Sequence, residues 1–251
     1  PKPGIIDPAT AKDVIAAINE GASLAMAGDA AALVTNPIQK EALYSAGFRH
    51  QGHTDYLAAL ASKSGPRPHE VMMLVARDLR TVPLTVHIPF KDVVAALSAE
   101  MIVSQAHVVA HDLKKYFGII RPRLAFTGLN PHAGENGTIG REEQIIIIPA
   151  INQLRAEGLT VAGPLPADTA FHDEARAHYD AILCMYHDQA LIPVKTLDFH
   201  GGVNVTLGLP FIRTSPDHGT ALGIAGTGRA NPQSLIAALT LAGEMAAHVR
   251  R

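Results

Sequence analysis

Ala181-Ile182-Leu183-Cys184-Met185-Tyr186 is a short apolar run, and the polar residues His187-Asp188-Gln189 follow it directly. A short apolar run that ends at polar residues is typical of a buried strand. Further short runs of this kind alternate with longer helical patterns, which favours an α/β fold with a largely parallel sheet. The other predicted strands are 31–35, 71–75, 84–88, 124–129 and 203–209.

Longer segments between these runs repeat apolar residues with helical spacing. The first predicted helix, 8–27, has a typical start, because Asp7 is a suitable N-cap and Pro8 suits the first helical position. The long central pattern is expected to break near Ser98, and Gly118 and Gly158 are suitable helix ends. The predicted helices are 8–27, 39–46, 55–63, 90–116, 141–157 and 232–248.

Composition restricts the classes of function. A chain of 251 residues with 47% hydrophobic residues can bury a substantial core, in one large domain or in two lobes. A formal net charge of −2 and the lack of basic clusters argue against nucleic acid and anionic membranes as partners. The single cysteine, Cys184, excludes an intramolecular disulfide and fits a cytoplasmic protein.

Three histidines lie at or just after the ends of predicted strands. They are His87, His132 and His187. Ligands of open parallel sheets collect beyond the carboxyl ends of the strands, and imidazoles at three such ends suit a divalent metal with open positions. The alternative is three separate histidines, each satisfied by its own hydrogen bonds.

Two carboxylates share this context. Asp188 is next to His187, and Asp168 follows the short apolar segment 163–167. Either carboxylate can orient a metal-binding imidazole, hold a substrate amine or assist proton transfer. The alternative for Asp168 is that it caps a helix beginning near Ala170.

A set of cationic and polar residues suits an anionic substrate. Lys195 and Arg213 lie in apolar surroundings, and Asn204 opens a predicted strand. His53 and Thr54 lie at a predicted helix N-terminus, where unpaired N–H groups favour anions. Capping explains Thr54 in part, but it does not explain His53.

A segment rich in small residues precedes the last predicted helix and can approach a nucleotide closely. Its spacing matches neither the G-x-G-x-x-G fingerprint nor a Walker loop, so a conventional Rossmann site is not supported. The candidate cofactor-binding residues are His218, Gly219, Thr220, Ala221, Gly226, Gly228 and Asn231.

Several of these segments, in this order, resemble the 4-hydroxythreonine-4-phosphate dehydrogenase family. The matching stretches begin at 33–40 and reach the final helix, and the most specific are 129–135, 163–169, 185–189 and 203–221. The resemblance implies a two-lobed α/β fold of the isocitrate and isopropylmalate dehydrogenase type. We expect residues 1–50 and 203–251 to form the nucleotide-side lobe, and 51–202 the lobe for metal, substrate and dimerisation.

The resemblance also implies the roles of the candidate residues. His87, His132 and His187 are the expected ligands of a divalent metal (zinc, magnesium or cobalt). The protein is expected to form a homodimer with shared active sites. The expected substrate is a small phosphorylated hydroxy amino acid. The residues expected to bind it are His53, Thr54, Lys195, Asn204 and Arg213. Lys195, Asp188 and Asp168 are the candidates for proton transfer, and NAD or NADP is the expected hydride acceptor.

The implied activity is oxidation of 4-phosphohydroxy-L-threonine to a β-keto acid that loses carbon dioxide, in pyridoxal phosphate biosynthesis. The family's opening strand and glycine-rich turn have no match here, so we expect either a longer polypeptide in nature or an impaired form. Gly201-Gly202 also replaces an expected basic residue. The alternatives are a dehydrogenase of a sugar-acid phosphate or an aromatic cis-dihydrodiol, a metal-dependent hydrolase, and a non-catalytic binding protein.

Overall fold

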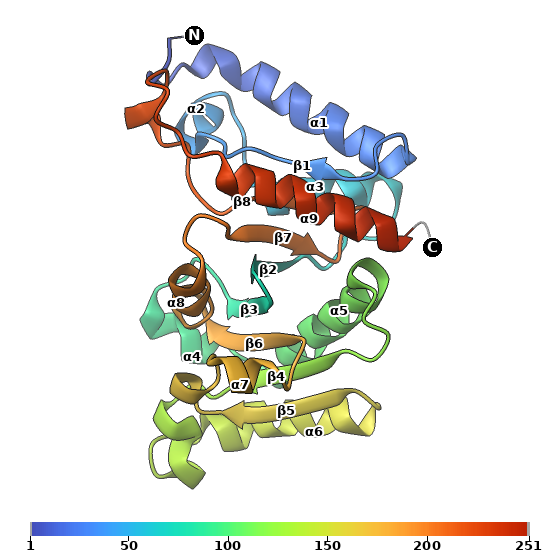
Figure 1. Ribbon diagram of the computed structural model, residues 1–251, viewed down its shortest axis with the longest axis vertical. Coiled ribbons are helices and arrows are strands. Elements are labelled where there is room, and N and C mark those ends of the chain that lie inside the picture. The colour runs from blue at the N-terminus through green and yellow to red at the C-terminus, as the bar shows by residue number, and fades with distance from the viewer. Residues whose placement is uncertain (1, 250–251) are drawn as a thin grey trace. The chain divides into compact units, whose positions relative to one another are not determined.

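The computed structural model describes residues 2–249 and forms two compact units (Figure 1). Unit 1 combines Pro1–Glu70 with Val203–Arg251, and unit 2 is Val71–Gly202. Sequence analysis placed the two boundaries at 50/51 and 202/203. The segment after residue 50 belongs to unit 1 because α3 (His53–Ala61) buries Leu57 and Ala58 in one apolar cluster with Ile18 of α1 (Ala11–Ala27).

Unit 2 contains five strands in the order β2-β3-β6-β4-β5. The four strands β3, β6, β4 and β5 run parallel, and β2 pairs with β3 in the antiparallel direction. The strands are β2 (Val71–Ala76), β3 (Leu79–Thr85), β4 (Arg123–Thr127), β5 (Thr160–Leu165) and β6 (Ala181–Tyr186). The first five residues of β6 are buried, as expected of a strand with neighbours on both sides.

Helices cover this sheet. Ile182 and Cys184 alternate along β6 and share an apolar cluster with Ala190 and Val194 of α8. The helical elements of unit 2 are η3 (Phe90–Asp92), α4 (Val93–Ala96), α5 (Ala99–Phe117), η4 (Pro131–Gly137), η5 (Glu143–Ile147), α6 (Ile148–Ala156), η6 (Ala167–Thr169), α7 (Asp173–Arg176) and α8 (His187–Leu197). The predicted break near Ser98 is confirmed, since Ser98 Oγ accepts a hydrogen bond from Met101 N at the start of α5.

Unit 1 is built on three strands. β8 (Arg213–Pro216) pairs in parallel with β1 (Leu33–Val34) and in the antiparallel direction with β7 (Val203–Leu207). Thr214 Oγ1 on β8 donates a hydrogen bond to Ala238 O of α9 (Gln233–Val249), which packs on β7 and β8. The other helical elements are η1 (Pro8–Thr10), α1, α2 (Lys40–Ser45), α3, η2 (Ser62–Ser64) and η7 (Leu222–Ile224).

β8 and α7 were not predicted, and three further elements differ from the sequence expectation for identifiable reasons. The strand predicted at 84–88 ends at Thr85 and begins earlier, at Leu79, so His87 follows the strand. β5 was missed because Gly163-Pro164 interrupts its apolar residues and the strand is only partly buried. α8 was missed because it begins at the strand end and contains Pro193.

Within residues 2–249, no single helix is both long and apolar enough to cross a bilayer. The segments Phe90–Ala96 and Ala99–Phe117 reach the length and apolar content of a membrane span only when they are counted together, and the chain bends by 91° between them.

Candidate functional site

The parallel pairing of β3 and β6 brings two of the three candidate histidines together. The register aligns Thr85 with Tyr186, so the residues that follow leave the sheet at one edge. His87 lies just beyond β3, and His187 is the first residue of α8. Their ring centroids are 5.7 Å apart with an interplanar angle of 44°. This edge therefore presents two imidazoles to the same space.

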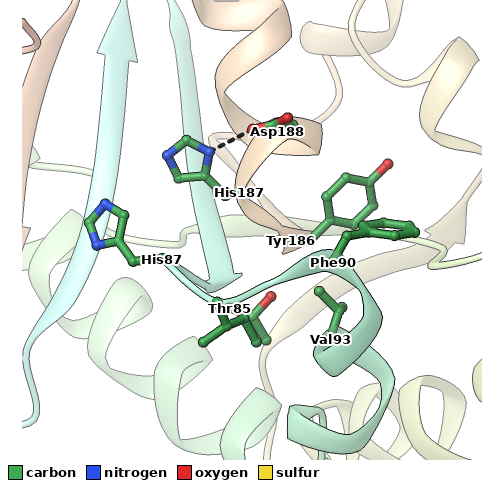
Figure 2. A pocket seen from close by; sticks show the side chains of 8 residues that line it. Thr85, His87, Phe90, Val93, Tyr186, His187 and Asp188 are labelled. Atoms are coloured by element: carbon green, nitrogen blue, oxygen red, sulfur yellow. Dashed lines mark hydrogen bonds and ion pairs between the residues drawn. The ribbon is translucent and has the colours of Figure 1, made fainter.

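That space is a pocket of about 320 Å³. Figure 2 shows His87 and His187 on one side of it and the aromatic rings of Phe90 and Tyr186 on the other. Asp188 Oδ1 lies 2.7 Å from His187 Nδ1. With Nδ1 donating to the carboxylate, Nε2 of His187 keeps its lone pair, which is the state that a metal requires.

His132 does not join this pair within one copy of the chain. Across residues 2–249, no three or more metal-binding side chains come together. His132 lies in η4, where Nδ1 is 3.8 Å from Glu135 Oε2 and the side chain is 64% exposed. The structure thus brings together two of the three predicted metal ligands and leaves the third accessible.

Unit 1 contains a buried guanidinium without a carboxylate partner in the described part of the chain. Arg213 is 4% exposed. Its Nη1 donates to Thr206 Oγ1 at 3.0 Å and its Nη2 to Thr35 Oγ1 at 2.7 Å. Burial lowers the pKa of Arg213 to about 10, so the group stays charged at neutral pH. A buried charge held only by neutral hydroxyls leaves its attraction for an anion uncompensated.

Other predicted substrate residues lie near this guanidinium. Thr206 faces Arg213 across the β7–β8 pair, and Asn204, two residues earlier, is on the same face of β7. Thr54 Oγ1 is 3.5 Å from Thr206 Oγ1. Within the described residues, Asn204 Oδ1 and Arg213 Nε are buried without a hydrogen-bond partner. Such atoms are costly unless a ligand supplies the missing bonds.

His53 completes this set at the N-terminus of α3. Its pKa is lowered to about 4, first by burial and then by the charge of Arg213. The imidazole is therefore neutral at physiological pH. We call Thr35, His53, Thr54, Thr206 and Arg213 the arginine cluster. A buried cation beside a helix N-terminus is chemically suited to bind a phosphate.

The remaining candidates fall in separate places. Lys195 is in the last turn of α8, with Nζ 5.3 Å from the centroid of the Phe199 ring. Asp168 and Asp188 both line a second pocket of about 690 Å³ in unit 2. The alternative for Asp168 is wrong, because it lies inside the short turn η6 and no helix begins at Ala170.

The predicted cofactor segment is an exposed loop before α9. His218, Gly219, Ala221, Gly226, Gly228 and Asn231 are exposed, and Thr220 is half-buried. Thr220 Oγ1 donates to Gln39 Oε1 at 2.9 Å. Asn231 Oδ1 accepts from Gln233 N at 3.0 Å, which caps α9. The contacts thus account for Asn231 structurally and leave most of the loop accessible.

Sequence analysis missed Thr35 and Thr206 as members of the arginine cluster. Thr206 was recoverable, because it alternates with Asn204 along a predicted strand and therefore shares its face. Thr35 was not, since its contact with Arg213 spans 178 positions of sequence and depends on the β1–β8 pairing.

Comparison with known proteins gives consistent results. A family model described as "Pyridoxal phosphate biosynthetic protein PdxA" matches residues 1–242. The 4-hydroxythreonine-4-phosphate dehydrogenase of Bradyrhizobium diazoefficiens is 58% identical over 246 residues, which are 98% of this chain and 71% of that protein. The enzyme of the same name from Xanthobacter autotrophicus is 56% identical over 245 residues, covering 97% and 70%.

Solved structures agree with these relatives. The 4-hydroxythreonine-4-phosphate dehydrogenase of Klebsiella pneumoniae matches with a TM-score of 0.89 and 40% identity, over 98% of this chain and 74% of that one. A terephthalate 1,2-cis-dihydrodiol dehydrogenase from Burkholderia xenovorans LB400 matches with 0.71 and 29%, over 97% and 76%. The predicted α/β class with mostly parallel strands, distinct from a Rossmann fold, is confirmed.

The arginine cluster predicts an unusual histidine titration. In NMR, His53 should titrate near pH 4, and Arg213→Met should raise its pKa only partly, because burial is the larger cause. The unfolded chain binds this proton more readily, so the free energy of unfolding should fall as the pH drops from about 6.5 towards 4.

Arg67→Met is the matched control, since Arg67 belongs to the same unit but pairs with Asp55 and Glu70. It should leave the His53 titration unchanged. An ordinary His53 titration near pH 6.5 in the unmodified protein would contradict the described environment.

Proposed function

The chain belongs to the family of the pyridoxal phosphate biosynthetic protein PdxA, and on this premise we propose that it is a 4-hydroxythreonine-4-phosphate dehydrogenase. The reaction oxidises 4-phosphohydroxy-L-threonine with NAD or NADP to a β-keto acid. Loss of carbon dioxide then gives 3-amino-2-oxopropyl phosphate for pyridoxal 5'-phosphate biosynthesis. The observation that carries the proposal is the buried Arg213, which has no carboxylate partner among residues 2–249.

Arg213 and its neighbours are proposed to bind the substrate phosphate. The unpaired Nε of Arg213 supplies one charge-assisted donor, and the first N–H groups of α3 and Thr54 Oγ1 supply others. Asn204 Oδ1 is an acceptor for a substrate hydroxyl or ammonium group. Binding energy from the remote phosphate orients the reacting carbon without taking part in its chemistry.

The residues at the end of β3 and β6 fit a divalent metal. His87 and His187 offer two imidazole nitrogens as ligands, and Asp188 orients the ring of His187. When bound, the metal lowers the pKa of a ligating alcohol and the nicotinamide of NAD or NADP accepts a hydride. Asp188, Asp168 and Lys195 are the candidates for moving the alcohol proton. Imidazole nitrogens suit zinc or cobalt, whereas magnesium prefers oxygen ligands, so the donor set favours zinc or cobalt.

His132 is proposed to reach this metal from a second copy of the chain. It is exposed and does not join His87 and His187 in its own copy. Large apolar side chains are exposed near the histidine pair and near His132. Phe90, beside the pocket, is 70% exposed, and Ile145, after the His132 loop, is 61% exposed. Exposed apolar side chains of this size are typical of surfaces that a partner covers. A symmetric homodimer would place each His132 at the other copy's histidine pair.

The exposed 218–231 loop is the proposed binding segment for NAD or NADP. Gly219, Gly226 and Gly228 lack side chains that would hinder close approach of a nucleotide. Rival functions fit less well. A metal-dependent hydrolase has no need of this loop, and an aromatic cis-dihydrodiol offers no anionic phosphate to Arg213.

An activity assay tests the function directly. Protein, divalent metal, NAD or NADP and 4-phosphohydroxy-L-threonine should produce reduced nicotinamide absorbance. Arg213→Met should raise KM about tenfold to a hundredfold, because a charge-assisted bond is worth roughly 1.5–3 kcal/mol, with Arg67→Met as control. Phosphate release without any absorbance change would favour hydrolysis, and the lack of any turnover would favour a binding protein.

Mixing variants tests the shared metal site. His132→Ala and His187→Ala proteins should each be inactive, with losses of a hundredfold or more. Random exchange of subunits should restore about a quarter of the activity, because half of the dimers are mixed and each contains one intact site. If His132 and His187 of the same copy bound one metal, the mixture would stay inactive, and that outcome would refute a metal site shared between copies.

A further inference from the structure

We infer that Glu143 is a positioning residue that holds the loop carrying His132 in a left-handed conformation. The inference rests on the proposed function, in which His132 is a metal ligand. It assigns a role to a buried carboxylate that neither the predicted site nor the α/β fold explains.

The backbone of the His132 loop has positive φ angles, which residues other than glycine normally avoid. His132, Ala133, Glu135 and Asn136 have φ angles between 42° and 57°, and Gly134 has φ 78°. A left-handed conformation costs a non-glycine residue on the order of 1–2 kcal/mol. Four such residues in one turn do not persist unless surrounding contacts fix them, and strain of this kind concentrates at functional sites.

Glu143 supplies those contacts at the start of the loop. Its side chain is 2% exposed, and among the described residues no cation pairs with it. Oε1 accepts from the backbone N–H groups of Leu129 and Asn130, both at 2.8 Å. Oε2 accepts from Asn130 Nδ2 at 2.9 Å. One carboxylate therefore fixes the two residues from which the left-handed turn departs.

The glycines of the loop are fitted to this carboxylate. A Cβ on Gly134, where φ is already positive, would collide with Glu143 Oε2. A Cβ on Gly128 would lie 2.6 Å from Ala133 Cα and 3.2 Å from Glu143 Oε1. The backbone thus closes around Glu143 on two sides, which explains why glycines stand at these positions.

Glu143 also begins an irregular helical turn. Residues Glu143–Ile147 form a π-helix before α6, and Pro149 cannot donate the N–H that a regular turn would need. Turns of this kind are rare and occur often at functional sites. The additional residue in the turn places Glu143 under the loop, whereas Ile147 is buried in the core.

Metal binding by the dimer, measured with cobalt(II), tests this role. Glu143→Ala should weaken cobalt affinity about tenfold to a hundredfold, as loss of a supporting contact does in other metal sites. Glu143→Gln keeps an acceptor for both backbone N–H groups and should retain most of the affinity. Glu157→Gln, at the far end of α6, is the matched control and should not differ from the unmodified protein.

Two further readouts separate positioning from general stability. Hydrogen exchange in the metal-free protein should accelerate at Leu129 and Asn130 in Glu143→Ala, while protection of unit 1 by inorganic phosphate stays unchanged. If Glu143→Ala does not fold, Gly134→Ala should reproduce the loss of cobalt affinity, because its methyl group displaces the same loop.

The outcomes distinguish this inference from the proposed function. Full cobalt affinity in Glu143→Ala, together with its loss in His132→Ala, would overturn the role of Glu143 alone. Loss of phosphate protection along with cobalt binding would also overturn it, since the role would then be structural. Full affinity in His132→Ala would refute the ligand assignment, and the inference with it.

Discussion

The parallel register of β3 and β6 is the constraint on which the candidate metal site depends. Because Thr85 is aligned with Tyr186, the segments that follow β3 and β6 leave the sheet at the same edge. The imidazoles of His87 and His187 therefore lie close together. A slip of one residue would displace one ring by about 3.3 Å and reverse the faces of the strand's side chains. The apolar cluster between β6 and α8 opposes such a slip, so core packing fixes the geometry of the site.

The two units hold their candidate ligands by different physical means. In unit 2, two imidazoles lie together at strand ends and a carboxylate orients that of His187, which suits a cation. In unit 1, a guanidinium is buried on two neutral threonine hydroxyls, which suits an anion. Thr206 and Thr35 accept hydrogen bonds from Nη1 and Nη2 of Arg213 without cancelling its charge, whereas a carboxylate at either position would cancel it.

Much of the fold and part of the site could be predicted from the sequence. The strand-end rule brought His87 and His187 together correctly, because it depends only on strand direction. It could not place His132, since residues 128–131 separate that residue from the end of β4 and His132 itself opens a left-handed turn. It also could not reveal Thr35, which meets Arg213 only after β1 and β8 pair. Contacts distant in sequence and unusual φ angles account for what was missed.

Anomalous X-ray diffraction from crystals grown with cobalt(II) tests the central claim most directly. The account predicts one anomalous peak per subunit, within bonding distance of a nitrogen of His87 and of His187, with His132 of a second copy as the third imidazole. A cobalt ion bound elsewhere, or bound without these two rings, would contradict it.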